Sequence, residues 1–468
     1  MKNSILTIAL ASMATIALTS CGGTSPVTNS SATTTSAGTT TSEATSSSAA
    51  ASSVSNDGET HKLTIAGGEL QKSQDYLNEV ATAFKAAHPE TNFEFTINAI
   101  SEADAKTQLT QDPTTAPDVC IIADDQLYDL AKGGYIADIN DIDQGLAADV
   151  ESRNVAMSVS SSKYLDDLYA FPVSNSNGFF LYYDSALITL DDCDTFEKLL
   201  AAVKAASIKD NKSYKFAFPS TSGWYLAGWS QAVGLNASLD KTTAKTVSDW
   251  NSTTHDPKGV DTFGSLVKLA QGEYKDYWVG EKDSTAINDS AAGGTYQVIA
   301  TINGTWSSST IATNWGTGAA ATDLPSFAVG TKSYHMNSVG GCKLAVVNSV
   351  SSEAAWGAEF ANFLTNKENQ VLRYDELAEA PTNIAASNAV DLTTNYAVAA
   401  LSLQSAYAFS LNVSNNFWTP TETLDAALNA GADGTTSLIT SGAGTANIVI
   451  NNEALQTTLD TAVTSMIA

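Results

Sequence analysis

The chain has 468 residues, enough for several domains of ~150 residues each. Apolar residues make up 43% and charged residues only 16%, so Ser, Thr, Asn and Gly supply much of the surface polarity. The 23 basic residues against 50 acidic residues give a net charge of −27 at pH 7. Because so acidic a chain is repelled by phosphate backbones and by anionic lipid headgroups, nucleic acid is nearly excluded as a partner.

The first twenty residues have the pattern of a secretory leader. Lys2 is followed by an apolar stretch over residues 5–18, which is too short to span ~30 Å of hydrocarbon. The sequence Leu-Thr-Ser-Cys-Gly at residues 18–22 resembles a bacterial lipobox, in which the cysteine becomes the lipidated first residue. We predict a lipoprotein signal peptide over residues 1–20 and lipidation of Cys21. An ordinary signal peptide with a chance cysteine is the alternative.

A segment rich in hydroxyl side chains follows the leader. Ser and Thr account for 20 of the 37 residues from Gly22 to Gly58. Such a segment cannot bury enough apolar surface to offset the entropy of ordering it. We therefore predict that residues 21–60 comprise the lipidated cysteine and a disordered tether. Its length favours the extracellular face of the cytoplasmic membrane in a single-membrane, Gram-positive bacterium.

The first folded elements are predicted to form a βαβ unit. Residues 63–66 form a short apolar strand, residues 76–87 carry apolar side chains at helical spacing, and residues 93–97 alternate as a second strand. A continuous apolar run over residues 117–122 is typical of a buried parallel strand. Two aspartates follow this strand, where open α/β sheets place their ligands.

Several short motifs, taken in order, resemble the extracellular solute-binding proteins of ABC sugar importers of the maltose/maltodextrin class. The similarity covers roughly residues 62–420 and rests on their order and spacing. The motifs include Phe84–Pro89 (FKAAHP), Ala116–Val119 (APDV), Leu130–Ile136 (LAKGGYI), Tyr169–Val173 (YAFPV), Asn303–Trp306 (NGTW) and Ala380–Asn383 (APTN).

The resemblance implies an α/β, two-lobed periplasmic-binding-protein-like fold, in which each lobe is a mainly parallel sheet flanked by helices. Hinge crossovers join the lobes, which close on ligand. It also implies a monomer that delivers its ligand to the permease subunits of an ABC transporter. The expected boundaries are residues 61–170 plus 340–388 for lobe one and residues 171–339 plus 389–468 for lobe two, with hinge candidates at Phe171–Ser174 and Met336–Gly341.

Aromatic side chains are the first candidates for a saccharide site, because the C–H faces of sugars pack flat on aromatic rings. Trp224, Trp306 and Trp418 lie where the resembling proteins carry stacking aromatics. Phe417 is an alternative to its neighbour Trp418 for the residue that faces the sugar. A role in the hydrophobic core is the competing interpretation for each tryptophan.

Polar candidates come from the first lobe. Asp125 matches a sugar-binding aspartate of the family, although it is equally suited to cap a helix that begins near Leu127. Glu69 follows the first strand, where the family places hydroxyl-binding groups; a solvated loop carboxylate is the alternative.

The sequence also departs from the maltose pattern, which makes maltodextrin as the specific ligand doubtful. Asn175 and Asn177 are candidates to supply the missing hydrogen bonds, because amides both donate and accept. The departures are Ile122 for a tryptophan, Gln126 for an arginine, and Ser176 and Ser222 near positions that carry glutamate.

Catalytic chemistry finds little support. The four histidines show no His-Glu-x-x-His spacing, and Ser160–Lys163 lacks the partner motifs that a Ser-x-x-Lys enzyme requires. We predict a carbohydrate-binding protein with no enzymatic activity, no cofactor and no metal. A secreted glycoside hydrolase, a surface adhesin, and a binder of a peptide or polyamine remain as alternatives.

Once Cys21 is lipidated, three cysteines remain, which allows at most one disulfide. Cys120 lies in an apolar strand and is expected to be a small buried hydrophobe. We predict no structural disulfide, with Cys193 and Cys342 as the pair to check.

Overall fold

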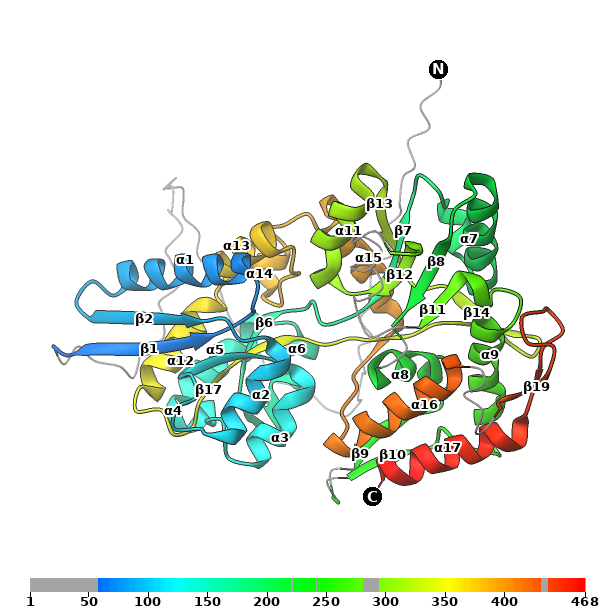
Figure 1. The fold of residues 1–468 in the computed structure, drawn as a ribbon. Coiled ribbons are helices and arrows are strands. Elements are labelled where there is room, and N and C mark those ends of the chain that lie inside the picture. Colours follow the sequence, from blue (N-terminus) through cyan, green and yellow to red (C-terminus); the bar gives the residue numbers. More distant parts are fainter. Residues whose placement is uncertain are drawn as a thin grey trace, which may run out of the picture. The chain divides into compact units, whose positions relative to one another are not determined.

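The computed structural model describes residues 58–219, 222–240, 242–243, 245–280, 294–430 and 437–467. The predicted signal peptide, Cys21 and nearly all of the predicted tether lie outside these residues. Two five-stranded sheets, each covered by helices, organise the described part of the chain (Figure 1).

The first sheet has the strand order β2-β1-β3-β17-β6. β1 is parallel to β2 and β3, whereas β17 is antiparallel to both β3 and β6, so four of the five strands point the same way. The predicted βαβ unit is confirmed. The strands are β1 (Thr60–Ala66), β2 (Asn92–Asn98), β3 (Val119–Ala123), β6 (Phe171–Ser174) and β17 (Lys343–Val347).

Helices cover both faces of this sheet; Figure 1 shows α1 and α2 on opposite sides of it. The covering helices are α1 (Gln71–Ala87), α2 (Glu102–Gln111), α3 (Leu127–Lys132), α4 (Ile139–Ile142), α5 (Gln144–Arg153), α6 (Ala156–Ser161), α12 (Ala354–Leu364), α13 (Lys367–Leu377) and α14 (Ile384–Ser387).

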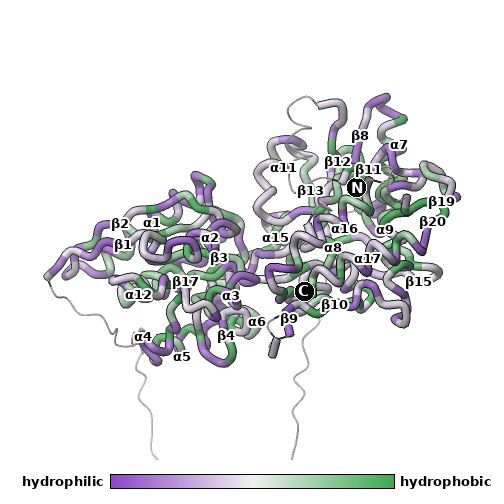
Figure 2. The backbone as a smooth tube through the Cα atoms, turned by 60° about the horizontal axis from the view of Figure 1, so that its bottom comes forward, coloured by the Kyte–Doolittle hydropathy of each residue, from purple (hydrophilic) through white to green (hydrophobic). Residues whose placement is uncertain are grey.

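Strand β3 shows why this sheet is buried on both faces. Val119 and Ile121 pack into the cluster formed with α1 and α12, and Cys120 and Ile122 pack on the other face against α2 and α3. Side chains alternate across a strand, so an uninterrupted apolar run supplies both faces at once. Figure 2 shows hydrophobic colour along the interior strands and hydrophilic colour on outlying loops.

The second sheet has the order β11-β8-β12-β7-β13. β11, β8 and β12 are parallel, β7 is antiparallel to its neighbours β12 and β13, and four of the five strands again share one direction. Its strands are β7 (Phe180–Asp184), β8 (Tyr214–Phe218), β11 (Trp278–Gly280), β12 (Gln297–Asn303) and β13 (Ala319–Thr322).

Longer helices and the largest hydrophobic cluster accompany this second sheet. The helices are α7 (Phe196–Asp210), α8 (Gly223–Ala232), α9 (Gly259–Gln271), α11 (Ser308–Trp315), α15 (Tyr396–Gln404), α16 (Trp418–Ala430) and α17 (Asn452–Met466). Two-stranded pairs complete the described residues: β4 (Lys163–Tyr164) with β5 (Asp167–Leu168), β9 (Ala237–Asp240) with β10 (Lys245–Ser248), β14 (Ser326–Val329) with β15 (Lys332–His335), β16 (Ser338–Val339) with β18 (Ala408–Phe409), and β19 (Ile439–Ser441) with β20 (Val449–Ile450).

The chain passes between the two sheets after β6 and before β17. Strand β6, which we expected to begin lobe two and to serve as a hinge, pairs with β17 in the first sheet, and all four of its residues are buried. The chain therefore leaves the first sheet after Ser174, because β6 is paired within that sheet. We refer to the first sheet with its helices as lobe one and to the second as lobe two.

Gly341 lies just before β17, where the chain returns to the first sheet, and its surroundings leave little room for a side chain. A Cβ at this position would lie 2.4 Å from Asp124 Oδ1, and Gly341 does not have a positive φ. The carboxylate of Asp124 thus packs directly on the crossover backbone. Close approach of Asp124, rather than a positive φ, therefore accounts for this glycine.

Among the described residues, no helix is long and apolar enough to cross a membrane. Cys120, Cys193 and Cys342 are buried free thiols.

Candidate ligand-binding site

A cavity of ≈ 550 Å³ is lined by residues of both lobes. Lobe one contributes the segment after β1, the start of α2, the start of β17 and the end of α13; lobe two contributes the segment after β12 and the starts of α11 and α15. The lining residues used below are Glu69, Glu102, Trp306, Lys343, Glu379 and Tyr396.

Two other cavities have similar volumes, ≈ 580 Å³ and ≈ 570 Å³. The first is lined by α9 and the β14–β15 and β19–β20 pairs, and the second by α16 and α17 with the residues just before α16. Neither contains a predicted site residue. A further cavity of ≈ 490 Å³ is also lined by both lobes, through Lys106 and Asp129 on one side and Lys245 and Asn415 on the other, but it too contains no predicted site residue. The ≈ 550 Å³ cavity, which both lobes line and which contains Glu69 and Trp306, is therefore the candidate site and is called the shared cavity below.

Trp306 lines this cavity from lobe two, together with Tyr396. Strand β12 ends at Asn303, whose side chain accepts a hydrogen bond from the Gly304 amide at 2.9 Å, while the Tyr182 hydroxyl donates to the Gly304 carbonyl at 2.9 Å. A Cβ at Gly304 would lie 2.1 Å from the Trp306 ring, so only glycine permits this ring position. Trp306 is half-buried, and its ring centroid lies 5.7 Å from that of Trp224. Its partial exposure fits a ligand platform better than a core residue.

Trp224 and Trp418 lie near the starts of two helices that pack together. Trp224 follows Gly223 in α8, where the Ser222 hydroxyl accepts a hydrogen bond from its amide at 3.3 Å. A Cβ at Gly223 would lie 2.5 Å from Thr421 Cβ in α16, the helix that begins with Trp418. Both tryptophans are half-buried. The structure thus gathers the three predicted tryptophans into neighbouring elements of lobe two, although only Trp306 lines the shared cavity.

Phe417, next to Trp418, was predicted as an alternative residue to face the sugar, and its position in the structure corrects this. Its side chain is 0% exposed, and its ring lies 5.5 Å from that of the fully buried Trp250. A ring enclosed by the core cannot contact a ligand in this structure. Of the two neighbours, Trp418 is the one that reaches the surface.

Asp125 lies at the end of β3, as predicted, but does not cap the following helix. The N-cap residue of α3 is Gln126, and its side chain makes no capping bond. Asp125 Oδ1 is buried and has no hydrogen-bond partner among the residues that the structure describes. Burial raises the pKa of Asp125 to about 7, with a further rise from Asp124 and an opposing effect of Lys106. A buried acceptor without a partner suits binding of a hydroxyl, although Asp125 does not line the cavity.

Asn175 and Asn177 lie in the first crossover and line a separate cavity of ≈ 210 Å³. The Asn175 backbone N–H donates to the Ala380 carbonyl at 2.7 Å, and the Asn177 side-chain amide donates to Asp124 Oδ1 at 3.2 Å. The structure therefore does not bring these amides to the larger cavity.

Glu69 lies just after β1, is exposed, and lines the larger cavity from lobe one. Within the described part of the chain its carboxylate makes no hydrogen bond; only its backbone carbonyl is used, by Gln74 at 3.1 Å. It is free to contact a ligand.

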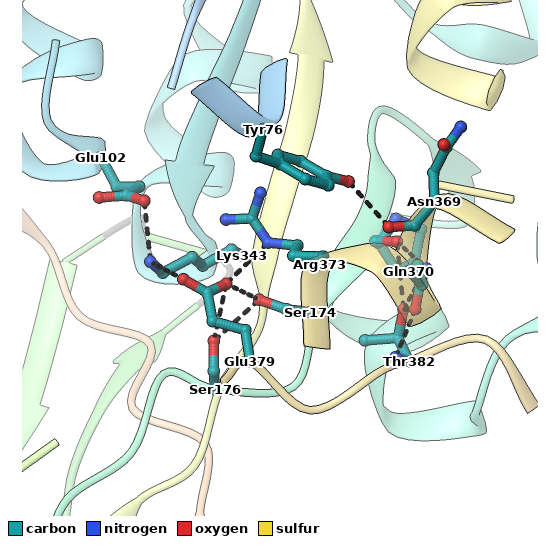
Figure 3. A network of polar contacts seen from close by, with 11 residues as sticks. Tyr76, Glu102, Ser174, Ser176, Lys343, Asn369, Gln370, Arg373, Glu379 and Thr382 are labelled. Atoms are coloured by element: carbon teal, nitrogen blue, oxygen red, sulfur yellow. Dashed lines mark hydrogen bonds and ion pairs between the residues drawn. The ribbon is translucent and has the colours of Figure 1, made fainter. Parts of the chain in front are cut away.

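A buried ion network forms the rest of the lobe-one wall (Figure 3). Lys343 Nζ lies 2.8 Å from Glu102 Oε1 and 2.9 Å from Glu379 Oε1, and Arg373 Nε lies 2.8 Å from Glu379 Oε2. Burial opposes ionisation of Glu379, but the Arg373 and Lys343 cations hold its pKa well below the usual range. The network contains two carboxylates and two cations, so this side of the cavity carries no net charge.

Ser176, which stands near a position where the family carries glutamate, is part of this network. Ser174 and Ser176 both donate to Glu379 Oε2, at 2.8 and 3.3 Å. Glu379, in the segment after α13, thus places a carboxylate beside Ser176. Sequence reasoning missed Glu102, Lys343 and Glu379, since a charged residue beside an apolar strand or helix usually lies on a solvated face.

The two lobes and their shared cavity define a ligand-binding protein of the two-lobed class. The model of the bacterial extracellular solute-binding protein family matches residues 79–400, and the chain belongs to this family. The family consists of binding proteins, in agreement with the prediction that the chain is not an enzyme. No curated protein sequence matches the chain.

Solved structures share the fold. A maltodextrin-binding protein from L. casei BL23, solved without ligand, matches with a TM-score of 0.70 at 20% identity, over 88% of this chain and 100% of that chain. The GacH receptor of Streptomyces glaucescens GLA.O, solved unliganded and with acarbose and an acarbose homolog, gives 0.67 at 16%, over 87% and 99%. A further protein solved with acarbose gives 0.71 at 24%, over 87% and 99%. The predicted two-lobed α/β fold is confirmed.

Proposed function

We propose that this solute-binding protein captures a carbohydrate, an oligosaccharide of the maltodextrin type or a related one, between its two lobes. The observation that carries the proposal is the half-buried Trp306 ring on the lobe-two side of a cavity whose lobe-one side carries Glu69 and Glu102. An aromatic face together with acceptors for hydroxyls is the combination that a sugar requires. The maltodextrin- and acarbose-binding proteins among the structural neighbours support the same class of ligand.

The ligand is expected to favour the closed arrangement of the lobes, because only there do both walls contact it. Trp306, Trp224 and Trp418 would provide stacking surfaces, and Glu69 and Asp125 would accept hydrogen bonds from hydroxyls. Asn175 and Asn177, in the crossover, would act at the hinge side of the site.

We further propose that the protein is a monomer anchored through lipidated Cys21 to the extracellular face of the cytoplasmic membrane and delivers its sugar to ABC permease subunits. Replacing Cys21 by Ala should release the folded protein into the medium or leave its leader uncleaved. A variant that is still processed and still fractionates with membranes would overturn the anchor.

Titration calorimetry against gluco-, galacto-, fructo- and xylo-oligosaccharides tests the ligand class. Binding of at least one series, with a smaller radius of gyration in small-angle scattering at saturation, is the expected result. The absence of binding to every series, with binding of a peptide or a polyamine instead, would refute the carbohydrate proposal. Release of reducing ends from a bound oligosaccharide would show hydrolysis rather than binding.

A further inference from the structure

Glu102 is the first residue of α2, and its carboxylate lies at the edge of the shared cavity. Ser101 caps the helix by accepting a hydrogen bond from the Asp104 amide at 3.1 Å. The Gln126 side chain donates to the Glu102 carbonyl at 3.0 Å, which fixes the backbone on a second side. The side chain of Glu102 is 21% exposed, so it is accessible from the cavity.

One oxygen of this carboxylate is engaged and the other is available. Oε1 accepts a hydrogen bond from Lys343 at 2.8 Å, and in the described part of the chain Oε2 accepts none. A carboxylate has about four acceptor positions. Glu102 can therefore accept hydrogen bonds from a ligand without giving up its bond to Lys343.

Lys343 has a donor to spare. It begins β17, and two of its three N–H groups are accounted for by Glu102 and Glu379. Both carboxylates flank the ammonium, and their charges raise its pKa although burial opposes this. The charged form is thus retained in a side chain that is only 14% exposed.

Glu379 differs from Glu102 because its oxygens are already occupied. It accepts hydrogen bonds from Lys343, Arg373, Ser174 and Ser176, and its side chain is 10% exposed. Glu379 consequently holds Lys343 in place, and its four hydrogen bonds within the protein take up the acceptor positions that a ligand would need. Its own partner Arg373 is held by the Tyr76 ring, 5.2 Å from the guanidinium carbon.

We propose that Glu102 and Lys343 together bind two adjacent hydroxyls of the sugar, Glu102 as acceptor and Lys343 as donor. Glu102 Oε1 and Lys343 Nζ lie 2.8 Å apart, so the free Oε2 of the same carboxylate and the remaining N–H of the ammonium are close enough to engage neighbouring ring hydroxyls at the same time. The wall of lobe one then selects for a vicinal diol, and Glu379 acts as a positioning residue. This inference rests on the proposed function, because it assumes a sugar in the shared cavity.

The test compares wild-type protein with Glu102→Gln and the matched control Glu94→Gln. Glu94 is also a carboxylate paired with a lysine, Lys62, at 3.0 Å, but this pair is exposed on lobe one and does not line the cavity. Calorimetry with maltotriose should show a ten- to hundredfold loss of affinity for Glu102→Gln and no change for Glu94→Gln. If the wild type does not bind maltotriose, the trisaccharide of the panel that does bind replaces it.

Deoxy analogues of the same trisaccharide distinguish direct contact from a structural role. Wild-type protein should bind one monodeoxy analogue at least tenfold more weakly than the parent sugar, and Glu102→Gln should lose this discrimination. Melting of the ligand-free variant should match wild type. Equal affinity of Glu102→Gln and wild type, retained discrimination, or a large loss of stability would each overturn the role of Glu102, whereas a wild type that binds no sugar would overturn the proposed function itself.

Discussion

The two walls of the shared cavity are built from different chemistry. Lobe one presents charged side chains whose positions are set by ion pairs with one another, and lobe two presents aromatic rings set by glycines and packed helices. An ion-pair wall is sensitive to loss of its most deeply buried charges, because an unpaired buried charge costs more than the pair contributes. Loss of an aromatic ring from the cavity wall is expected mainly to lower the affinity for the ligand and to change stability less. The predictions below test this difference.

The largest effect is expected from Arg373→Met. Arg373 is 2% exposed, and its removal leaves Glu379 with fewer cationic partners in a buried position. We expect the free energy of unfolding to fall by about 3–5 kcal/mol, measured by denaturant titration. Lys62→Met, which breaks an exposed pair, should cost no more than about 1 kcal/mol. Similar small losses in both variants would contradict the description of lobe one as a buried ionic wall.

Within lobe two, a comparison of Phe417→Ala with Trp418→Ala should distinguish a core residue from a residue that contacts the ligand. Removing the fully buried Phe417 ring should cost about 3–5 kcal/mol of stability. The half-buried Trp418 should cost less and should instead weaken sugar binding. Parallel melting and calorimetry measure both quantities. If Phe417→Ala folded normally and bound sugar more weakly, the assignment of the two neighbours would be reversed.

Trp306→Ala should lower affinity at least tenfold while leaving the fold intact. Stacking contributes about 0.5–1.5 kcal/mol beyond the area buried, and burial of the ring face adds to it. Trp250→Ala serves as the control, since that ring is 0% exposed and should affect stability alone. Normal sugar binding by Trp306→Ala would contradict the assignment of Trp306 as a stacking surface for the ligand.

The smallest effect concerns Asp125. The pKa of an unfolded aspartate is ~3.9, whereas burial and the neighbouring Asp124 raise the native pKa of Asp125 to about 7. The native state therefore retains a proton that the unfolded state releases, and this contribution to stability, fully present below pH ~4, is lost as pH rises through about 7. Asp125→Asn should abolish that part of the pH dependence, so its free energy of unfolding should change less than that of wild type between pH ~4 and ~7. Parallel pH profiles for wild type and variant would contradict the raised pKa.

The aromatic candidates were easier to find than the charged ones. Trp306 follows an apolar strand within a short motif, and Gly304, on which its ring packs, lies only two residues before it, so local pattern and resemblance were sufficient. Glu102, Lys343 and Glu379 come from three segments far apart in the chain. No spacing rule connects them, because their relation exists only after the first sheet has formed.

The segments around the passage between the sheets, and the Phe417–Trp418 pair, were equally hard to predict from local sequence. The motif Phe171–Ser174 was predicted as a hinge, yet its side chains form a buried strand whose pairing with β17 depends on residues that follow much later. Likewise the Phe417–Trp418 pair has two adjacent aromatic rings, and only the packing of Trp250 decides which of them is enclosed.

The periodicity of apolar residues indicated the βαβ unit and the buried strand of the first lobe, and the resemblance of the short motifs implied the class of protein and its two-lobed α/β fold. These features are local, and the hydrophobic pattern of each segment already specifies which of its faces must be buried. The tertiary structure decided which carboxylates have free oxygens, which rings reach the cavity and where the chain passes between sheets. Burial and hydrogen bonding depend on neighbours brought together by folding, and a carboxylate becomes either a structural ion or a ligand contact according to how many of those neighbours it meets.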